Sequence, residues 1–403
     1  MTATQPRPKT TTPSFLNRIR LAAVITMLLL GIAASWLVVS TKQNLSAGAS
    51  YANLYVETVQ ARSALQNADI AAAGALAASG SAQAEQRQAY DASLREASAL
   101  VTTILSNSSD SDATLATVHW GYSSYVRQVE TALTLLGRDN AAAAKQVGAA
   151  SSYLRETLDP ALATLGAANA KAASAQLGAE ANGWIAPMAI GALAILIALS
   201  VLLALRTHRY VNLGMALAAA TVVGMWALAG STIGGLTTVG SGAAVPNLAR
   251  VNAIAVVQNQ VGQARADELQ ALIPGLDAAA KNGEMATLLA TAQANAAQFT
   301  PSVTGFDAAL REFVTATKTV QQLQDGGKST EAAGQAITLA GPKYTAADDA
   351  LSSAVVALNT KISSTLNGND LTLYGTAAGL MVLALVGTLA AAVGVGQRVR
   401  EYR

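Results

Sequence analysis

Cysteine is absent from the 403-residue chain, histidine occurs only twice, and charged residues make up only 12% of the sequence. Without cysteine the protein has no disulfide, no thiolate metal site and no cysteine nucleophile. Aromatic residues are also scarce, at 4%, whereas hydrophobic residues reach 52%, an unusual balance for a soluble protein. The alanine-rich, proline-poor remainder favours helix.

The shortage of reactive side chains argues against an enzyme. His119 follows an apolar residue of a helical stripe and is expected to be a partly exposed helix residue, while His208 lies in a basic turn. Asp348 and Asp349 are adjacent carboxylates, which on a polar helix are expected to form part of a solvated face. The chain has no glycine-rich loop that would cradle a phosphate. We therefore expect no catalytic or metal site, no cofactor and no nucleic-acid partner.

Four apolar runs are each long enough to cross a bilayer as a helix, which takes about 20 residues. The central pair, residues 184–205 and 211–230, is separated only by residues 206–210 and must form an antiparallel hairpin. The other runs are residues 21–40 and 371–396. None has an ionisable residue in its interior, whereas transporters keep such residues or broken helices at mid-membrane.

The first apolar run has an alternative interpretation as a secretory signal peptide. Signal peptides have an apolar region of about 7–15 residues. The run at residues 21–40 is longer, and Trp36 near its outer end suits an interfacial anchor. We therefore favour a retained transmembrane helix.

The short polar segments beside the apolar runs are basic. They are the tail at residues 1–20, the turn at residues 206–210 and the tail at residues 397–403. Positive charge is enriched on the cytoplasmic side of membrane helices, so each segment predicts the same orientation. We expect a multi-pass cell-membrane protein with both termini in the cytoplasm. The residues expected to contact a cytosolic partner are Arg18, Arg20, Arg206, His208, Arg209, Arg398 and Arg400.

Residues 41–183 and 231–370 fill the gaps between the apolar runs and are predicted to lie outside the cell. Turn residues divide the first segment into helices at about 44–78, 82–105, 112–136 and 140–183, the last running directly into residues 184–205. The second segment has breaks at Pro274-Gly275, Thr300-Pro301 and Asp325-Gly326-Gly327. The predicted fold is an all-α membrane protein with four transmembrane helices and two tandem extracytoplasmic four-helix bundles.

The two outer segments carry similar apolar stripes. Residues three and four apart share one face of a helix, and this spacing predicts a bundled helix in each segment. The shift along the chain that places Leu115 on Val303 also places Val118, Tyr122 and Tyr125 on Phe306, Leu310 and Phe313, which we interpret as an internal duplication. The first stripe is Leu115, Val118, Tyr122, Tyr125, Val129, Leu133 and Leu136, and the second is Val303, Phe306, Leu310, Phe313, Thr317, Val320 and Leu323.

Two further groups of residues are candidates for packing or binding. Glycines spaced by four, Gly230 with Gly234 and Gly375 with Gly379, are typical of close helix contacts. Charged residues inside an alanine-rich bundle suit a small zwitterion, although a solvated, salt-bridged face is the simpler interpretation. These weak ligand candidates are Arg62, Asp69, Arg265 and Asp267.

The order of span, four-helix bundle and span resembles the sensory half of bacterial chemoreceptors, in which two chains pair. One chain with two copies is similar to a covalently linked pseudo-dimer, and the resemblance implies that the first helix of each bundle, about 44–78 and 236–273, forms the contact. The basic tail Arg18-Ile19-Arg20, the RTHRY turn and the basic C-terminus also resemble actinobacterial GlnX-type membrane proteins. That resemblance implies a relay from a solute-binding lipoprotein to the cytosolic serine/threonine protein kinase G.

We therefore expect a signalling adaptor in the lipid bilayer. It would meet an extracytoplasmic binding protein or a small ligand, such as an amino acid, and hand the signal to a cytosolic partner. The alternatives are a structural cell-envelope scaffold and an accessory subunit of a transporter.

Overall fold

The computed structural model describes residues 12–108, 113–178, 182–207, 212–297, 303–367 and 370–401, and helices are the only regular secondary structure in these ranges. The predicted all-helical class is thus confirmed for the described residues. The helices are α1 (Thr12–Ala77), α2 (Ser81–Asn107), α3 (Ala113–Leu135), α4 (Asn140–Tyr153), the π-helical η1 (Leu154–Leu158), α5 (Asp159–Leu177), α6 (Asn182–Thr207), α7 (Leu213–Thr237), the π-helical η2 (Thr238–Ala244), α8 (Val245–Ala271), α9 (Ala278–Ala296), α10 (Phe306–Asp325), α11 (Ser329–Gln335), the π-helical η4 (Ala336–Ala340), α12 (Gly341–Asn367) and α13 (Asp370–Glu401).

These helices form two compact units. The first, which we call the apolar unit, holds the described residues of Met1–Ala47, Ala175–Ala244 and Ser364–Arg403. The second, the polar unit, holds those of Gly48–Ser174 and Val245–Ser363. We refer to these two segments of the polar unit as its first and second halves.

The apolar unit contains the helices that sequence analysis predicts to be membrane spans. Four described helices are long and apolar enough to cross a membrane, and their apolar segments lie in α1, α6, α7 and α13. The residue types explain the pattern, because a helix satisfies all its backbone hydrogen bonds internally and so tolerates a lipid environment. Large apolar side chains such as Leu29, Ile190 and Leu389 are exposed on these helices.

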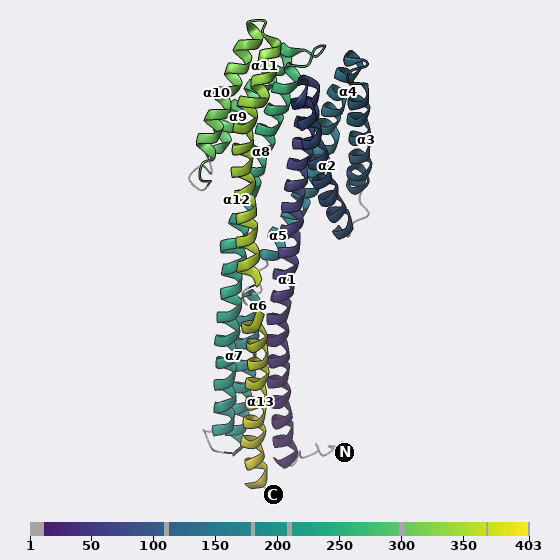
Figure 1. The fold of residues 1–403 in the computed structure, drawn as a ribbon. Helices are drawn as coiled ribbons and strands as arrows, with labels where there is room; N and C mark the ends of the chain where they lie inside the picture. Colours follow the sequence, from purple (N-terminus) through teal and green to yellow (C-terminus); the bar gives the residue numbers. More distant parts are fainter. Residues whose placement is uncertain are drawn as a thin grey trace, which may run out of the picture. The chain divides into compact units, whose positions relative to one another are not determined.

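Glycine brings α7 and α13 together at one end of the apolar unit. A Cβ atom added to Gly214 would collide with the backbone of Ala390 and Gly394. Asn212 fixes the same end, because its side-chain oxygen accepts from the Gly214 amide at 3.0 Å and its Nδ2 donates to the Gly394 carbonyl at 3.2 Å. Figure 1 shows α7 and α13 running side by side.

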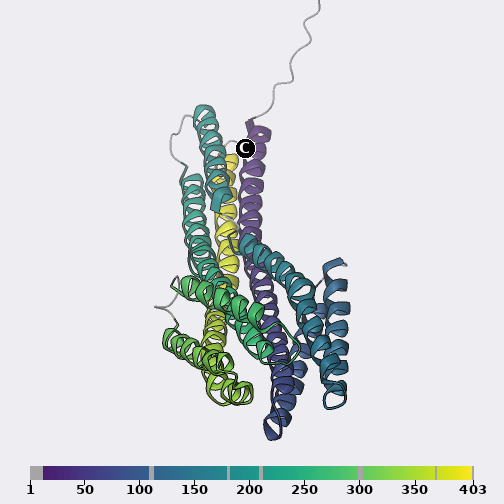
Figure 2. The same cartoon turned by 90° about the horizontal axis from the view of Figure 1, so that it is seen from above.

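Glycine also sets the approach of α1 to α13. A Cβ atom on Gly31 would collide with the Ala384 side chain, and one on Gly387 would collide with Met27 and Thr221. Figure 2, the view from above, shows α1 and α13 as neighbours. Small residues thus allow close backbone approach, as in membrane helix pairs.

The glycine pairs predicted from sequence are not at the close contacts. A Cβ atom on Gly230 or Gly375 meets no atom within 4 Å, and one on Gly379 would only touch Leu228 at an ordinary 3.4 Å. Gly234 is half-buried. Among the described residues no helix packs closely against Gly230 or Gly375, and their role in helix packing stays a prediction. A four-residue spacing places two glycines on one face but does not say which face meets a neighbour.

Turn residues end the helices of the first half where the sequence predicts. Gly80 and Gly137 have φ values of 64° and 81°, a left-handed conformation that glycine adopts at little cost. Asp139 caps α4, because its side chain accepts from the Ala142 amide at 3.0 Å. The predicted helices 82–105 and 112–136 are observed at Ser81–Asn107 and Ala113–Leu135.

The fourth helix of the first half differs from its prediction. It is interrupted by the π-helical η1, and it ends at Leu177 instead of running into the next apolar helix. Gly178 follows the last helical residue, and glycine is a weak helix former. Residues 179–181 lie outside the described ranges.

The second half repeats this plan. Gly275 and Gly327 have φ values of 95° and 73° and follow the ends of α8 and α10, as predicted. Asp277 caps α9 by accepting from the Ala280 amide at 3.1 Å. The predicted break at Thr300-Pro301 lies outside the described residues. The fourth helix again contains a π-helical segment, η4.

The apolar stripes form the core of each half. Val118, Tyr125 and Val129 are fully buried on α3, whereas Tyr122 is only half-buried. On α10 the buried set includes Phe306, Phe313, Thr317 and Val320. The shift that relates the two stripes carries Val118, Tyr125 and Val129 onto Phe306, Phe313 and Thr317, so these three pairs of positions are buried in both halves.

Candidate functional site

The two halves of the polar unit meet through polar side chains on their first helices. These contacts join α1 to α8, the pair of helices that the chemoreceptor resemblance implies. We call this interface the polar seam. Its hydrogen bonds run from Tyr55 Oη to Asn252 Oδ1 at 2.9 Å, from Gln66 Nε2 to Asn259 Oδ1 at 2.8 Å, and from Gln258 Nε2 to Ser63 Oγ at 3.0 Å.

Asp159, on α5, joins the seam from the first half. Its carboxylate accepts two hydrogen bonds from the Arg62 guanidinium, at 2.7 and 2.9 Å, and one from Asn259 Nδ2 at 2.8 Å. Both partners of the ion pair are largely buried, with side-chain exposures of 18% and 12%. Asp159 therefore holds its own first helix and the first helix of the other half at once.

Asp348, on α12, makes the corresponding contacts from the second half. It accepts from Gln258 Nε2 at 2.8 Å and from Asn67 Nδ2 at 3.2 Å. Tyr344, one turn earlier, donates to Asn67 Oδ1 at 2.7 Å. Burial raises the pKa of Asp348, and the charge of Asp349 raises it further, although the amide hydrogen bonds oppose this shift.

A second group of buried charges lies nearer the turns between α1 and α2 and between α8 and α9. Asp69 is 2% exposed and accepts from Ser151 Oγ at 2.6 Å. Gln270, from the other half, donates to the same Ser151 hydroxyl at 2.8 Å. Tyr125 completes the set at 3.5 Å, and burial raises the pKa of its hydroxyl well above the ordinary value, so it stays protonated as a donor.

Asp267, the counterpart candidate on α8, is 0% exposed and pairs with cations from two other helices. Arg155 Nη2 lies 2.6 Å and Lys281 Nζ 3.2 Å from its Oδ1 atom. Burial disfavours the charged Arg155, but the hydrogen bond and charge of Asp267 outweigh it and raise the Arg155 pKa. Because Arg155 belongs to η1 of the first half, this ion pair also crosses between the halves.

Arg265 makes its contacts inside the second half. Its guanidinium pairs with Glu268, and Nη2 donates to the Ala336 carbonyl at 2.8 Å. Ala336 begins η4, and a π-helical turn leaves carbonyl groups displaced from the regular helical pattern. The arginine therefore stabilises the irregular segment that it contacts.

The expected solvated, salt-bridged face is not observed. Asp69, Arg265 and Asp267 are buried, and Arg62 is half-buried. The sequence singled out these residues, but their partners came from helices far away in the chain. Asp348 is also buried, at 9% exposure, whereas Asp349 is exposed as predicted. His119 is exposed, and its ring lies beside Trp120.

Sequence analysis missed Arg155, Asp159, Gln258 and Asn259. A charged residue on an amphipathic helix gives no signal of its own when its partner is distant in sequence. One sequence signal could have found Asp159. The shift in residue number that aligns Asn140 with Ser329 also aligns Asp159 with Asp348.

The residues expected to meet a cytosolic partner are only partly described. Arg18, Arg20 and Arg400 are exposed on α1 and α13. The side chains of Arg206 and Arg398, and the whole of His208 and Arg209, lie outside what the structure describes.

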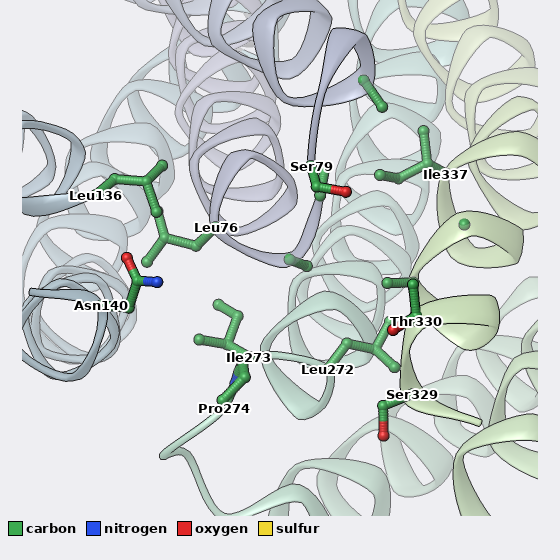
Figure 3. A pocket seen from close by; sticks show the side chains of 15 residues that line it. Leu76, Ser79, Leu136, Asn140, Leu272, Ile273, Pro274, Ser329, Thr330 and Ile337 are labelled. Atoms are coloured by element: carbon green, nitrogen blue, oxygen red, sulfur yellow. The ribbon is translucent and has the colours of Figure 1, made fainter. Parts of the chain in front are cut away.

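A cavity of about 340 Å³ lies between the turns of the two halves. Figure 3 shows Leu76, Leu136 and Asn140 on one side and Ile337, Thr330 and Ser329 on the other. Its lining contains no charged residue. Within the described ranges, no three His, Cys, Asp or Glu side chains are grouped to hold a metal ion.

Comparison with known protein families finds a match in the first half of the polar unit. Residues 46–178 are similar to a family described as an actinobacterial sensor domain. The matched stretch includes the whole of that half. No curated protein and no solved structure matches the chain significantly.

Proposed function

We propose that the protein is a four-span membrane adaptor that relays an extracytoplasmic cue to a cytosolic partner. The polar unit lies outside the cell and the basic segments lie inside. The similarity of residues 46–178 to a sensor domain supports a sensing role. The four apolar helices support a membrane location.

The observation that carries this proposal is the continuity of the seam helices with apolar helices. Continuous helix runs over Ser14–Ala77 and, with the π-helical η2 within it, over Leu213–Ala271; each stretch includes both an apolar segment and seam residues. By contrast, α5 ends at Leu177, and Gly178 lies outside the helix. A change in the α1–α8 contact therefore has a direct mechanical route along two helices.

The buried charges make the seam suited to switching. If one helix slides along the other so that a buried ion pair breaks, each charge is left without its partner. This costs several kcal/mol. Asp159, Arg155 and Asp267 each bond across the two halves, so the halves have few arrangements that keep every charge paired. A small number of discrete arrangements is what a signalling element requires.

We assign the partner contact inside the cell to the basic segments, chiefly Arg206 and Arg209 with the two tails. The partner is a cytosolic signalling protein, and the GlnX-type resemblance favours a serine/threonine kinase. Outside, the cue is a small molecule or a solute-binding protein.

The test is capture of the partner from native membranes. The full chain would be cross-linked mildly and purified as wild type and as Arg206→Gln with Arg209→Gln. We expect one cytosolic signalling protein to be enriched with the wild type and reduced several-fold with the variant at equal membrane insertion. Equal recovery with both would contradict the assigned contact, and enrichment of wall-assembly proteins only would favour a scaffold.

A further inference from the structure

Asp159 and Asp348 occupy equivalent places in the two halves but have different partners. They are related by the same shift along the chain as Asn140 and Ser329, the first residues of α4 and α11. Each accepts an amide N–H from the first helix of the opposite half, Asn259 for Asp159 and Asn67 for Asp348.

The difference lies in the donor from the same half. Asp159 receives a guanidinium from Arg62, whereas Asp348 receives a neutral amide from Gln258. Among the described residues, no lysine or arginine nitrogen forms an ion pair with Asp348. A buried carboxylate without a cation is costly, so this position is missing a positive charge that its counterpart has.

A cavity of about 290 Å³ lies beside Asp348. Ser63 and Ser352 line it as hydroxyl groups, and Val59 and Val355 give it an aliphatic wall. Glu96 and Asp349 add two further carboxylates, and no basic residue lines it. The field inside such a cavity attracts cations and repels anions.

We propose that this cavity binds a small organic cation, a guanidinium or primary ammonium on a short aliphatic chain. The charged end pairs with Asp348 as Arg62 pairs with Asp159, and the chain lies against the valines. The proposal deepens the proposed function, because a ligand here contacts α1, α8 and α12 at the seam between the halves.

Two other ligand classes fit less well. A free amino acid would place its carboxylate among Glu96 and Asp349 with no basic residue to receive it. A metal ion needs several oxygen ligands around one point, and the described residues contain no such group. The aliphatic wall has no role for a bare ion.

The test uses the purified full chain in lipid nanodiscs and measures heats of binding for agmatine and putrescine. Glutarate and 1,5-pentanediol serve as anionic and neutral probes. We expect one site for a cation, with no binding of the anion or the diol. Asp348→Asn should weaken cation binding at least tenfold, while Asp307→Asn, the same charge change on a half-exposed residue outside the cavity, should not.

Gln258→Arg provides a test that does not depend on losing stability. Its guanidinium should take the ligand's place, as Arg62 does in the first half, so this variant should lose cation binding and melt at a higher temperature than the wild type. Wild-type protein that binds neither cation, or both variants binding as the wild type does, would overturn the proposal. Because binding is measured without a cytosolic partner, that result would leave the relay itself to be judged by partner capture.

Discussion

Arg62 marks the clearest chemical difference between the two halves of the polar unit. Its guanidinium pairs with the buried Asp159, and breaking a buried ion pair by removing one partner is strongly destabilising. Exposed pairs contribute much less, because water screens both charges. The chain offers both kinds of arginine, since Arg87 pairs with Glu130 at 45% and 39% exposure.

We predict that Arg62→Gln lowers the free energy of unfolding of the polar unit by about 3 kcal/mol. Arg87→Gln should lower it by less than about 1 kcal/mol. Denaturant titration of the full chain, followed by circular dichroism, measures both. Adding guanidinium-bearing agmatine should stabilise both variants through the Asp348 cavity, and it should stabilise Arg62→Gln more because it also replaces the missing guanidinium. Equal losses in the two variants would contradict a buried role for Arg62.

Ionisation of Asp348 should lower the stability of the folded protein as the pH rises, whereas a carboxylate with a lowered pKa has the opposite effect. The raised pKa of Asp348, caused mainly by burial, means that the folded protein holds this proton more tightly than the unfolded chain does. The resulting stability is fully present below the ordinary carboxyl pKa of about 4 and is lost as pH rises through the raised value. The groups that share its surroundings are Glu96, Asp349 and Tyr344, none of which is a cation.

Asp348→Asn cannot ionise, so its stability relative to the wild type should increase from about pH 4 to neutral pH in the absence of ligand. Asp159→Asn should be destabilising at neutral pH, because it leaves Arg62 without its charged partner. Thermal melts at a series of pH values distinguish the two. A relative stability of Asp348→Asn that falls with rising pH would contradict an uncompensated charge at this position.

The sequence predicted some of these residues but not their surroundings. Asp69 and Asp267 were singled out because carboxylates are unexpected in an alanine-rich bundle, and both are buried. Their cationic or hydroxyl partners, Arg155 and Ser151, belong to a different helix and are separated by many residues. Side-chain pairing across a bundle depends on helix rotation, and composition does not determine rotation.

At the scale of elements, helices were predicted well where turn chemistry marks their ends. Gly80, Gly137 and Gly327 adopt the left-handed conformation expected at helix junctions. The π-helical segments η1 and η4 were not predicted, because neither contains the glycine, proline or aspartate that marks the predicted breaks. The close approaches at Gly31, Gly214 and Gly387 were not predicted, since many helix faces of the apolar unit carry small residues.

Substitution of Gly387 should therefore destabilise the apolar unit far more than substitution of Gly375. We predict that Gly387→Val lowers the stability of the apolar unit by about 1–3 kcal/mol, because its side chain would overpack against Met27 and Thr221. Gly375→Val places the same side chain in open space and should have little effect on packing. Melting in detergent, followed by circular dichroism, tests the pair. A larger loss in Gly375→Val would contradict the observed helix contacts.

At the scale of the whole molecule, the proposed topology makes a simple prediction. A reporter enzyme that is active only in the cytoplasm should be active when fused after Tyr210 or Arg403. It should be silent when fused after Gly80 or Gly327, because these residues lie in turns of the polar unit. Matched protein levels control for expression, and activity at Gly80 would contradict four membrane crossings.

The central claim is that the α1–α8 contact controls what the cytosolic side does, and a disulfide lock tests it most directly. The chain has no cysteine, so an introduced pair reports alone. Cysteine pairs would be scanned between residues 54–76 and 248–272 for intramolecular disulfides, which need Cα atoms within about 7 Å. The closing pairs should repeat every three or four residues. A locked pair should change cross-linking of the captured cytosolic partner several-fold relative to its reduced form and should stop it responding to an added cue. Partner cross-linking that is identical in the locked and reduced forms would contradict the account.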